Sequence, residues 1–173
     1  MLRFRPYPGL TIASAIAFLL LCALGMWQLD RLHWKTALIE TVNRNMTAAP
    51  ISLDAALAAP DMEYRPVTLT GRFDHAKEAY LFSSSAGGEA LYHVLTPFIA
   101  EDGRVLLVDR GVVPDSRRDP ATRMAGNPVG TVTLTGIWRV PEGPGLFTPV
   151  PDRQRRVWYA RDVRAIAAAS GIV

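Results

Sequence analysis

The chain has 173 residues, a formal net charge of +3 and a single cysteine. One cysteine excludes an intrachain disulfide and every Cys-x-x-Cys thiol, metal or haem-attachment motif. Without Arg3 and Arg5, the sequence carries 17 basic and 16 acidic residues, so it has no basic surface suited to nucleic acid.

Residues 9–28 predict a transmembrane helix. The nineteen residues 9–27 carry no charge, and at about 1.5 Å of rise per residue they match the roughly 30 Å hydrocarbon core of a bilayer. A cleaved signal peptide is the alternative, because Ala23-Leu24-Gly25 is an acceptable cleavage site. The apolar run exceeds the usual length of about 7–15 residues, which favours an uncleaved anchor.

Residues 1–8 are expected to form a cytoplasmic tail. Arg3 and Arg5 favour a cytoplasmic N-terminus by the positive-inside tendency. A helix that begins so close to Met1 leaves no room for an organelle transit peptide. The sequence therefore predicts a protein of the bacterial cytoplasmic (inner) membrane, in contact with the lipid bilayer, whose main domain is periplasmic.

Residues 29–48 predict a helical stalk that continues the membrane helix. Its apolar residues recur at spacings of three, four and seven: Leu29, Leu32, Ile39, Val42 and Met46. Pro50 ends this helix. Ser52 is a suitable cap for a short helix over Leu53–Ala58, which Pro60 ends.

Residues 49–173 predict a periplasmic β-rich domain, because the hydrophobic period changes to two. The expected strands are 64–73, 79–83, 91–99, 105–109 and 129–140, with 157–160 as a further short strand and 161–170 as a helix. The fold class is thus α+β and membrane-anchored. A mainly antiparallel, barrel-like domain with short flanking helices follows the N-terminal transmembrane helix.

The pentapeptide Val-Thr-Leu-Thr-Gly occurs at residues 67–71 and again at 132–136. One explanation of the repeat is that both copies are half-buried strands, which use the same residue types. An equally good explanation is that the two copies belong to pseudo-equivalent halves of a barrel.

Polar residues follow the strand expected at 105–109. Asp109 and Arg110 are interpreted either as a pair that satisfies loop backbone or as a site in which Arg110 offers a planar fork to a carboxylate, such as a haem propionate or a partner's side chain. Gly111 then begins a long polar segment, 111–130, which holds Arg117, Arg118 and Arg123. Long loops of this kind are functional or mobile.

No residue pattern indicates catalysis or a metal site. His33, His75 and His93 do not have the spacing of metal ligands on one element. The serines at 83–85, before Gly87-Gly88, lack a nucleophile motif and predict a turn. We expect no catalytic triad with His93 and Asp109, and a protein that is not an enzyme.

The sequence GMWQLDRLHWK, residues 25–35, stands at the end of the apolar run. Trp27 and Trp34 are seven residues apart and so lie near one helical face, where tryptophan commonly anchors a helix at the bilayer surface. A mixed polar set surrounds them: Gln28, Asp30, Arg31, His33 and Lys35. This set favours a second interpretation, a docking surface for another membrane protein.

Six segments together resemble the surfeit-locus-one family of cytochrome c oxidase assembly factors. They are GMWQLDRLHWK, YRPVTLTGRFD, YHVLTPF, LLVDRGVVP, VTLTGIWRVPE and VWYARDVRAIA, and they cover most of the chain in the family's order. The family's Gly-x-Trp-Gln-x-x-Arg motif falls on Gly25, Trp27, Gln28 and Arg31. Its Arg-Gly-Trp-Val-Pro motif falls on residues 110–114, with Val112 at the Trp position.

The resemblance implies a non-enzymatic protein that assists haem a delivery to the catalytic subunit of a haem-copper oxidase, with haem a synthase as a further candidate partner. The implied partner- or haem-contacting residues are Gly25, Trp27, Gln28, Arg31, His33, Trp34, Arg110 and Gly111. A scaffold that holds oxidase intermediates without binding haem is the alternative, and a membrane-anchored periplasmic enzyme is a third.

The resemblance also implies a second, C-terminal transmembrane helix, preceded by a segment like Asn-His-Leu-Gln-Tyr whose histidine is the expected haem ligand. That region is absent from this chain, which stops at Val173. No axial ligand for haem a is therefore identified, and His33 is a weak substitute. A fragment and a shortened family member are both consistent with this difference.

Overall fold

The computed structural model describes residues 7–58 and 62–172. The chain divides into two compact units, Met1–Asn45 and Met46–Val173, which we call the anchor unit and the β unit. Arg3 and Arg5, on which the expected orientation rests, lie outside the described residues, as does Pro60.

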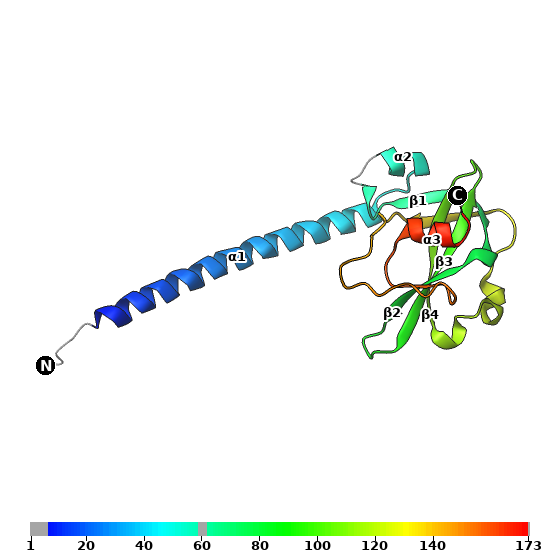
Figure 1. Cartoon of the computed structure of the whole chain (residues 1–173). Helices are drawn as coiled ribbons and strands as arrows, with labels where there is room; N and C mark the ends of the chain where they lie inside the picture. The colour runs from blue at the N-terminus through cyan, green and yellow to red at the C-terminus, as the bar shows by residue number, and fades with distance from the viewer. Residues whose placement is uncertain (1–6, 59–61, 173) are drawn as a thin grey trace. The chain divides into compact units, whose positions relative to one another are not determined.

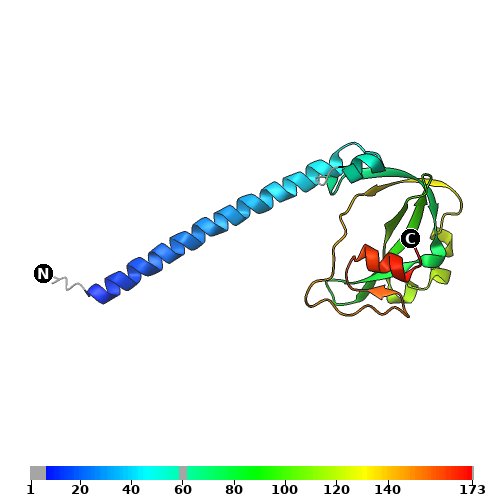
Figure 2. The same cartoon turned by 45° about the horizontal axis from the view of Figure 1, so that its top comes forward.

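One long helix, α1, forms most of the described part of the anchor unit. It runs from Pro8 to Thr47, so its last two residues belong to the β unit (Figure 1). Its 40 residues correspond to about 60 Å of helix, and none of them is buried. One stretch of it is long and apolar enough to cross a membrane. Both views show the helix unbroken, so the helical periodicity beyond Trp27 is confirmed (Figure 2).

The short helix α2, Leu53–Ala58, forms where the sequence predicts it. The backbone N–H of Ala55 donates to the Ser52 hydroxyl at 3.3 Å, which confirms Ser52 as the cap. Leu53 and Ala56 are buried against Val67, so α2 closes one small part of the core.

The β unit is built on a six-stranded, mainly antiparallel sheet. Its strands are β1 (Pro66–Phe73), β2 (Ala79–Ser84), β3 (Ala90–Ala100), β4 (Val105–Pro114), β5 (Val132–Ile137) and β6 (Val157–Trp158). Their order is β5-β1-β3-β2-β6, and β4 also pairs with β3. Only β6 runs parallel to its neighbour, β2.

The predicted fold class is confirmed, but "barrel-like" is too strong a description. The long strand β3 pairs with β2 and β1 along successive parts of one edge and with β4 along the other edge. In the described part of the chain no pairing joins β4 to β5, and the sheet therefore stays open.

The helix α3, Val163–Ala169, covers one face of the sheet (Figure 1). Asp162 caps it, because its side chain accepts from the N–H of Ala165 at 3.0 Å. Ile166 is fully buried and packs in a cluster with Leu95 and Trp158. The predicted helix at 161–170 is thus confirmed with slightly shorter bounds.

The largest difference from the predicted elements lies in β4. The sequence predicts a strand that ends at Asp109 and a loop from Gly111, whereas β4 continues to Pro114. Gly111 has a φ of +114°, which glycine adopts without strain, so it continues the strand instead of ending it. The rest of the expected loop contains two short 3-10 helices, η3 (Asp115–Arg117) and η4 (Pro120–Gly126).

The two copies of Val-Thr-Leu-Thr-Gly are neighbouring antiparallel strands, β1 and β5. They pair about the central contact of Leu69 with Leu134. Two hydroxyl pairs, Thr68–Thr135 at 3.1 Å and Thr70–Thr133 at 3.0 Å, link them on one face. The repeat therefore stabilises a single two-stranded ribbon with local two-fold symmetry.

Candidate functional site

The structure places six of the eight predicted contact residues on α1. All six have exposed side chains or, for glycine, an exposed surface: Gly25, Trp27, Gln28, Arg31, His33 and Trp34. The other two, Arg110 and Gly111, belong to β4 in the β unit. The predicted site is therefore distributed over two different kinds of element.

Four residues of α1 form what we call the Trp stripe: Trp27, Arg31, Trp34 and Leu38. Spacings of four, three and four residues put them on one face of the helix. The Arg31 guanidinium carbon lies 5.5 Å from the centre of the Trp27 ring, a cation–π geometry. Trp27 and Trp34 are 51% and 62% exposed, so this face is available for contact.

The Gly-x-Trp-Gln-x-x-Arg motif does not lie on one face. At 3.6 residues per turn, Gly25 falls on the side of the helix opposite Trp27, and Gln28 falls between the two. No heavy atom outside its own helical turn lies within 4 Å of the Cβ position at Gly25. The motif thus has two different surfaces on α1: the aromatic ring of Trp27 on one side, and Gly25, which has no side chain, on the other.

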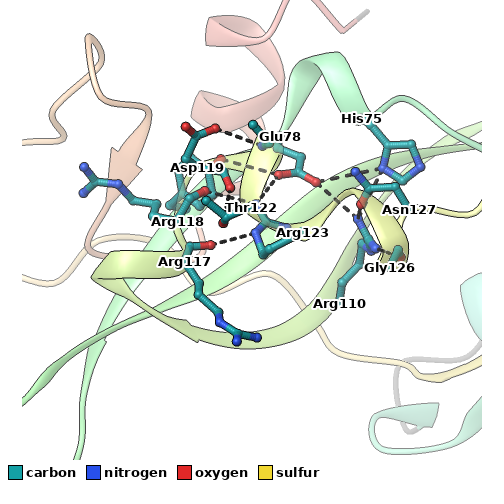
Figure 3. Close-up of polar contacts among 12 residues, drawn as sticks. His75, Glu78, Arg110, Arg117, Arg118, Asp119, Thr122, Arg123, Gly126 and Asn127 are labelled. Carbon is teal, nitrogen blue, oxygen red and sulfur yellow. Dashed lines mark hydrogen bonds and ion pairs between the residues drawn. The ribbon is translucent and has the colours of Figure 1, made fainter.

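Arg110 lies in a buried charge cluster around Glu78 (Figure 3). Glu78 precedes β2 and is only 1% exposed. Arg110 Nη1 donates to its Oε1 at 3.2 Å, and Arg123 Nη2, from η4, donates to its Oε2 at 2.7 Å. The Tyr80 hydroxyl donates to Oε2 at 3.4 Å. A carboxylate between two guanidiniums satisfies its buried charge.

The remaining contacts of Arg110 are also made within the chain. Nη1 donates to Asn127 Oδ1 at 2.8 Å and Nη2 donates to the carbonyl of Gly126. His75 Nε2 is 3.0 Å from the Pro128 carbonyl, which only accepts, so the proton is on Nε2. His75 Nδ1 then accepts from Arg110 at 3.2 Å. The planar fork of Arg110 therefore holds a carboxylate of its own chain.

The charge cluster fixes the segment that the sequence presents as a long loop. Arg123 donates from Nε to the carbonyl of Arg117 at 2.8 Å and from Nη2 to that of Arg118 at 3.1 Å. The same side chain reaches Glu78, so one arginine ties η3 and η4 to the start of β2. Burial, together with the Glu78 carboxylate, raises the pKa of Tyr80.

Glu78 and Arg123 were not predicted as site residues. Glu78 lies in a short polar segment just before a strand and belongs to no motif. A side chain in such a position is ordinarily exposed. The available signal was the excess of arginine in 110–123, because buried guanidiniums require a carboxylate partner.

Asp109 and His93, which were not predicted to form a triad, are in contact with each other. Asp109 Oδ2 is 2.8 Å from His93 Nδ1, and Oδ1 accepts from the N–H of Gly111 at 3.0 Å. Arg161 lies 3.9 Å from Asp109. Among the described residues, no hydrogen bond joins His93 to a serine hydroxyl. The pair holds the backbone at Gly111, as the first of the two interpretations of Asp109 proposed.

Two features of the described part of the β unit bear on a metal or haem site. Among residues 7–58 and 62–172, no three His, Cys, Asp or Glu side chains gather around a common point. An apolar cavity between β4 and α3, lined by Leu107, Val163 and Ala167, has a volume of about 30 Å³. Ligand sites for molecules of that class have volumes of roughly 300–1,000 Å³.

Comparison with known proteins places the chain in a family. The sequence model of the SURF1 family matches residues 15–172. Surfeit locus protein 1 of Mus musculus is 36% identical over 178 residues, which cover 94% of this chain and 57% of that protein. The human protein of the same name is 36% identical over 167 residues, with 86% of this chain and 55% of that protein covered.

A more distant animal relative is similar to the chain to almost the same extent. The SURF1-like protein of Caenorhabditis elegans is 34% identical over 172 residues, covering 86% of this chain and 53% of that protein. The chain therefore spans a little more than half the length of these relatives. The match to the family model over most of the sequence, together with these identities, shows that the chain belongs to the SURF1 family.

Proposed function

We propose that the chain is an assembly factor for a haem-copper (cytochrome c) oxidase and acts by protein contact in the membrane. Membership of the SURF1 family supports this function, because the six resembling segments are those of oxidase assembly factors. The proposed partner is the catalytic subunit of the oxidase, and haem a synthase is a further proposed partner.

The Trp stripe is the observation that carries this proposal. Trp27 and Arg31 stand where the uncharged run of α1 ends, and their side chains are exposed. Tryptophan and arginine are enriched among residues that dominate binding energy at protein interfaces. A second membrane protein could therefore contact the Trp stripe at the end of the membrane-spanning part of α1.

Contact, not catalysis, is proposed because the groups able to do chemistry in the β unit are engaged with each other. The Glu78 carboxylate holds Arg110 and Arg123, and the His93 imidazole holds Asp109. General acid–base and nucleophilic catalysis require such groups within reach of a substrate, in a pocket.

A scaffold that binds oxidase intermediates without haem is the form of this function that the β unit favours, since its apolar cavity of about 30 Å³ is far smaller than a site for a molecule of that size. Haem a delivery is the second form, and it rests on the family resemblance. His33 is the histidine of α1 proposed to contact haem in that case. Haem that stays with the purified chain through a salt wash would favour delivery over the scaffold.

We propose the bacterial cytoplasmic membrane as the location, with the N-terminus in the cytoplasm and the β unit in the periplasm. The uncharged length of α1 supports a membrane anchor. Alkaline phosphatase fused after the β unit is expected to be active in this orientation, and an inactive fusion with normal expression would reverse it.

The experiment that tests the function uses a strain that lacks this gene. A reduced-minus-oxidised spectrum of its membranes is expected to lose the haem a bands while the b- and c-type bands remain. The chain of 173 residues, returned on a plasmid, is expected to restore the haem a bands. Unchanged spectra and unchanged oxidase turnover in the deletion strain would contradict the proposal.

A further inference from the structure

The side of α1 that faces away from the Trp stripe carries a heptad pattern after the membrane segment. Its a and d positions alternate in steps of three and four residues: Leu29, Leu32, Thr36, Ile39, Asn43 and Met46. We call this set the heptad seam. All six side chains are exposed, and Leu32 and Ile39 are 57% and 58% exposed. Apolar residues that repeat every 3.5 positions are the pattern of helices that pair along their length.

The polar residues of this pattern specify how the helices pair. Lys35 occupies position g and Glu40 position e of the next heptad. These two positions lie opposite each other, on different chains, in a parallel pair in register. Asn43 occupies position a, where asparagine favours two strands in a single register. The charge pair and the asparagine therefore both match a second copy of the same helix.

A membrane anchor would impose the same arrangement. Two copies that enter one bilayer in one direction have residue 27 at the same depth, so their helices run parallel and in register. Confinement to one membrane also raises their effective concentration, which helps a seam of fewer than three heptads to associate. Helices in proteins gain most of their stability from the packing of an apolar face, which pairing would supply here.

We propose that two copies of this chain pair along the heptad seam as a parallel two-stranded coiled coil. Trp27, Arg31 and Trp34 lie at the heptad positions f and c, on the outside of such a pair. The dimer therefore presents two Trp stripes to other proteins. This dimerisation is independent of whether the partner of the Trp stripe is an oxidase.

Disulfide formation between two threonine positions tests the pairing. Thr36 lies at position a in the seam, and Thr41 lies at position f on the outer side. Both are exposed, and both hydroxyls donate to the carbonyl four residues earlier at 2.9 Å. In a chain with Cys22→Ser, which removes the single native cysteine, Thr36→Cys and Thr41→Cys are therefore matched variants.

Two differently tagged full-length copies are expressed together, and their membranes are treated with a mild oxidant. The Thr36→Cys chains are expected to form a disulfide between the two tags about tenfold faster than the Thr41→Cys chains, because only position a brings the thiols within bonding reach. Equal rates at both positions, or no disulfide at either, would overturn the pairing.

A charge reversal tests the register in the same assay. Lys35→Glu places a carboxylate opposite the partner's Glu40 and is expected to slow disulfide formation through Thr36→Cys several-fold. Addition of Glu40→Lys restores the attraction and is expected to restore the rate. A rate that Lys35→Glu leaves unchanged would contradict a parallel pair in this register.

Discussion

Arg31 and Arg110 were both predicted to contact a partner or haem, but their side chains have different surroundings in the two units. Arg31 lies on a helix without any buried residue, and its guanidinium lies over the neighbouring Trp27 ring. Arg110 is 16% exposed and contacts Glu78, Asn127 and His75 of its own chain. The comparison separates an arginine with an exposed side chain from one that contacts its own fold.

This difference assigns separate roles to the two units. The β unit uses its charges to keep a polar segment fixed on the sheet, so its substitutions are expected to change stability. The anchor unit has exposed aromatic and charged side chains and no core, so its substitutions are expected to change binding with little effect on folding. The predictions below test this division, in order of decreasing effect on stability.

The largest effect is expected from Glu78→Gln. The change leaves Arg110 and Arg123 without their carboxylate in a buried position, which costs roughly 3–5 kcal/mol of unfolding free energy. Thermal or denaturant unfolding of the full chain in detergent measures this cost. Glu89→Gln, at an exposed turn, is the control and is expected to change stability by less than about 0.5 kcal/mol. A loss no larger than that of the control would show that the charge cluster does not stabilise the fold.

Gly71→Ala is expected to have the next largest effect. A Cβ at this position would lie 2.2 Å from the carbonyl oxygen of Ile99 and 2.8 Å from the Cα of Ala100, both backbone atoms. The strands β1 and β3 must separate to admit it, at a cost of about 1–3 kcal/mol. Gly87→Ala is the matched control, because its nearest neighbour is a side-chain atom at 3.7 Å. Equal unfolding midpoints for the two variants would refute the close approach.

A smaller effect is expected from pH. The pKa of Tyr80 in the folded state is raised above its ordinary value of 10.0. The folded chain therefore holds this proton more tightly than the unfolded chain. Stability is retained below about pH 10 and falls as the pH rises through the folded pKa. Tyr80→Phe is expected to weaken this alkaline loss, measured by unfolding from pH 8 to 11, and an identical loss in both proteins would exclude Tyr80 as its source.

The smallest effect on stability is expected on α1. Trp27→Ala combined with Arg31→Ala removes exposed side chains and is expected to change the unfolding free energy of the β unit by less than about 0.5 kcal/mol. The protein level in membranes, measured by immunoblot, is expected to stay normal. A large fall in either quantity would mean that the Trp stripe contributes to folding.

Local patterns predicted most of the elements. The helical spacing of α1, the cap at Ser52 and the alternation in β1 and β3 are properties of neighbouring residues, and each was predicted close to its observed bounds. The end of β4 was predicted wrongly, because Gly111 normally indicates a turn. Here the Asp109 carboxylate holds its N–H and the strand continues.

Local sequence patterns did not predict the contacts between residues that are far apart in the sequence. Arg110 and Arg123 reach Glu78 across 32 and 45 positions of sequence, and no local period records that approach. The same limit hid the contact of His93 with Asp109, which depends on a bulge in the pairing of β3 with β4. The Trp stripe was predictable, because one helix places residues seven apart on one face.

The Trp stripe is proposed to be the surface through which the chain assists oxidase assembly. The most direct test is the haem a signal in reduced-minus-oxidised spectra of membranes with Trp27→Ala plus Arg31→Ala, at a normal level of the chain. Phe147→Ala plus Arg155→Ala removes an exposed aromatic side chain and an exposed arginine from the β unit and is the control. We expect a severalfold loss of the haem a bands in the α1 variant and normal bands in the control. Normal haem a bands in the α1 variant would contradict this proposal.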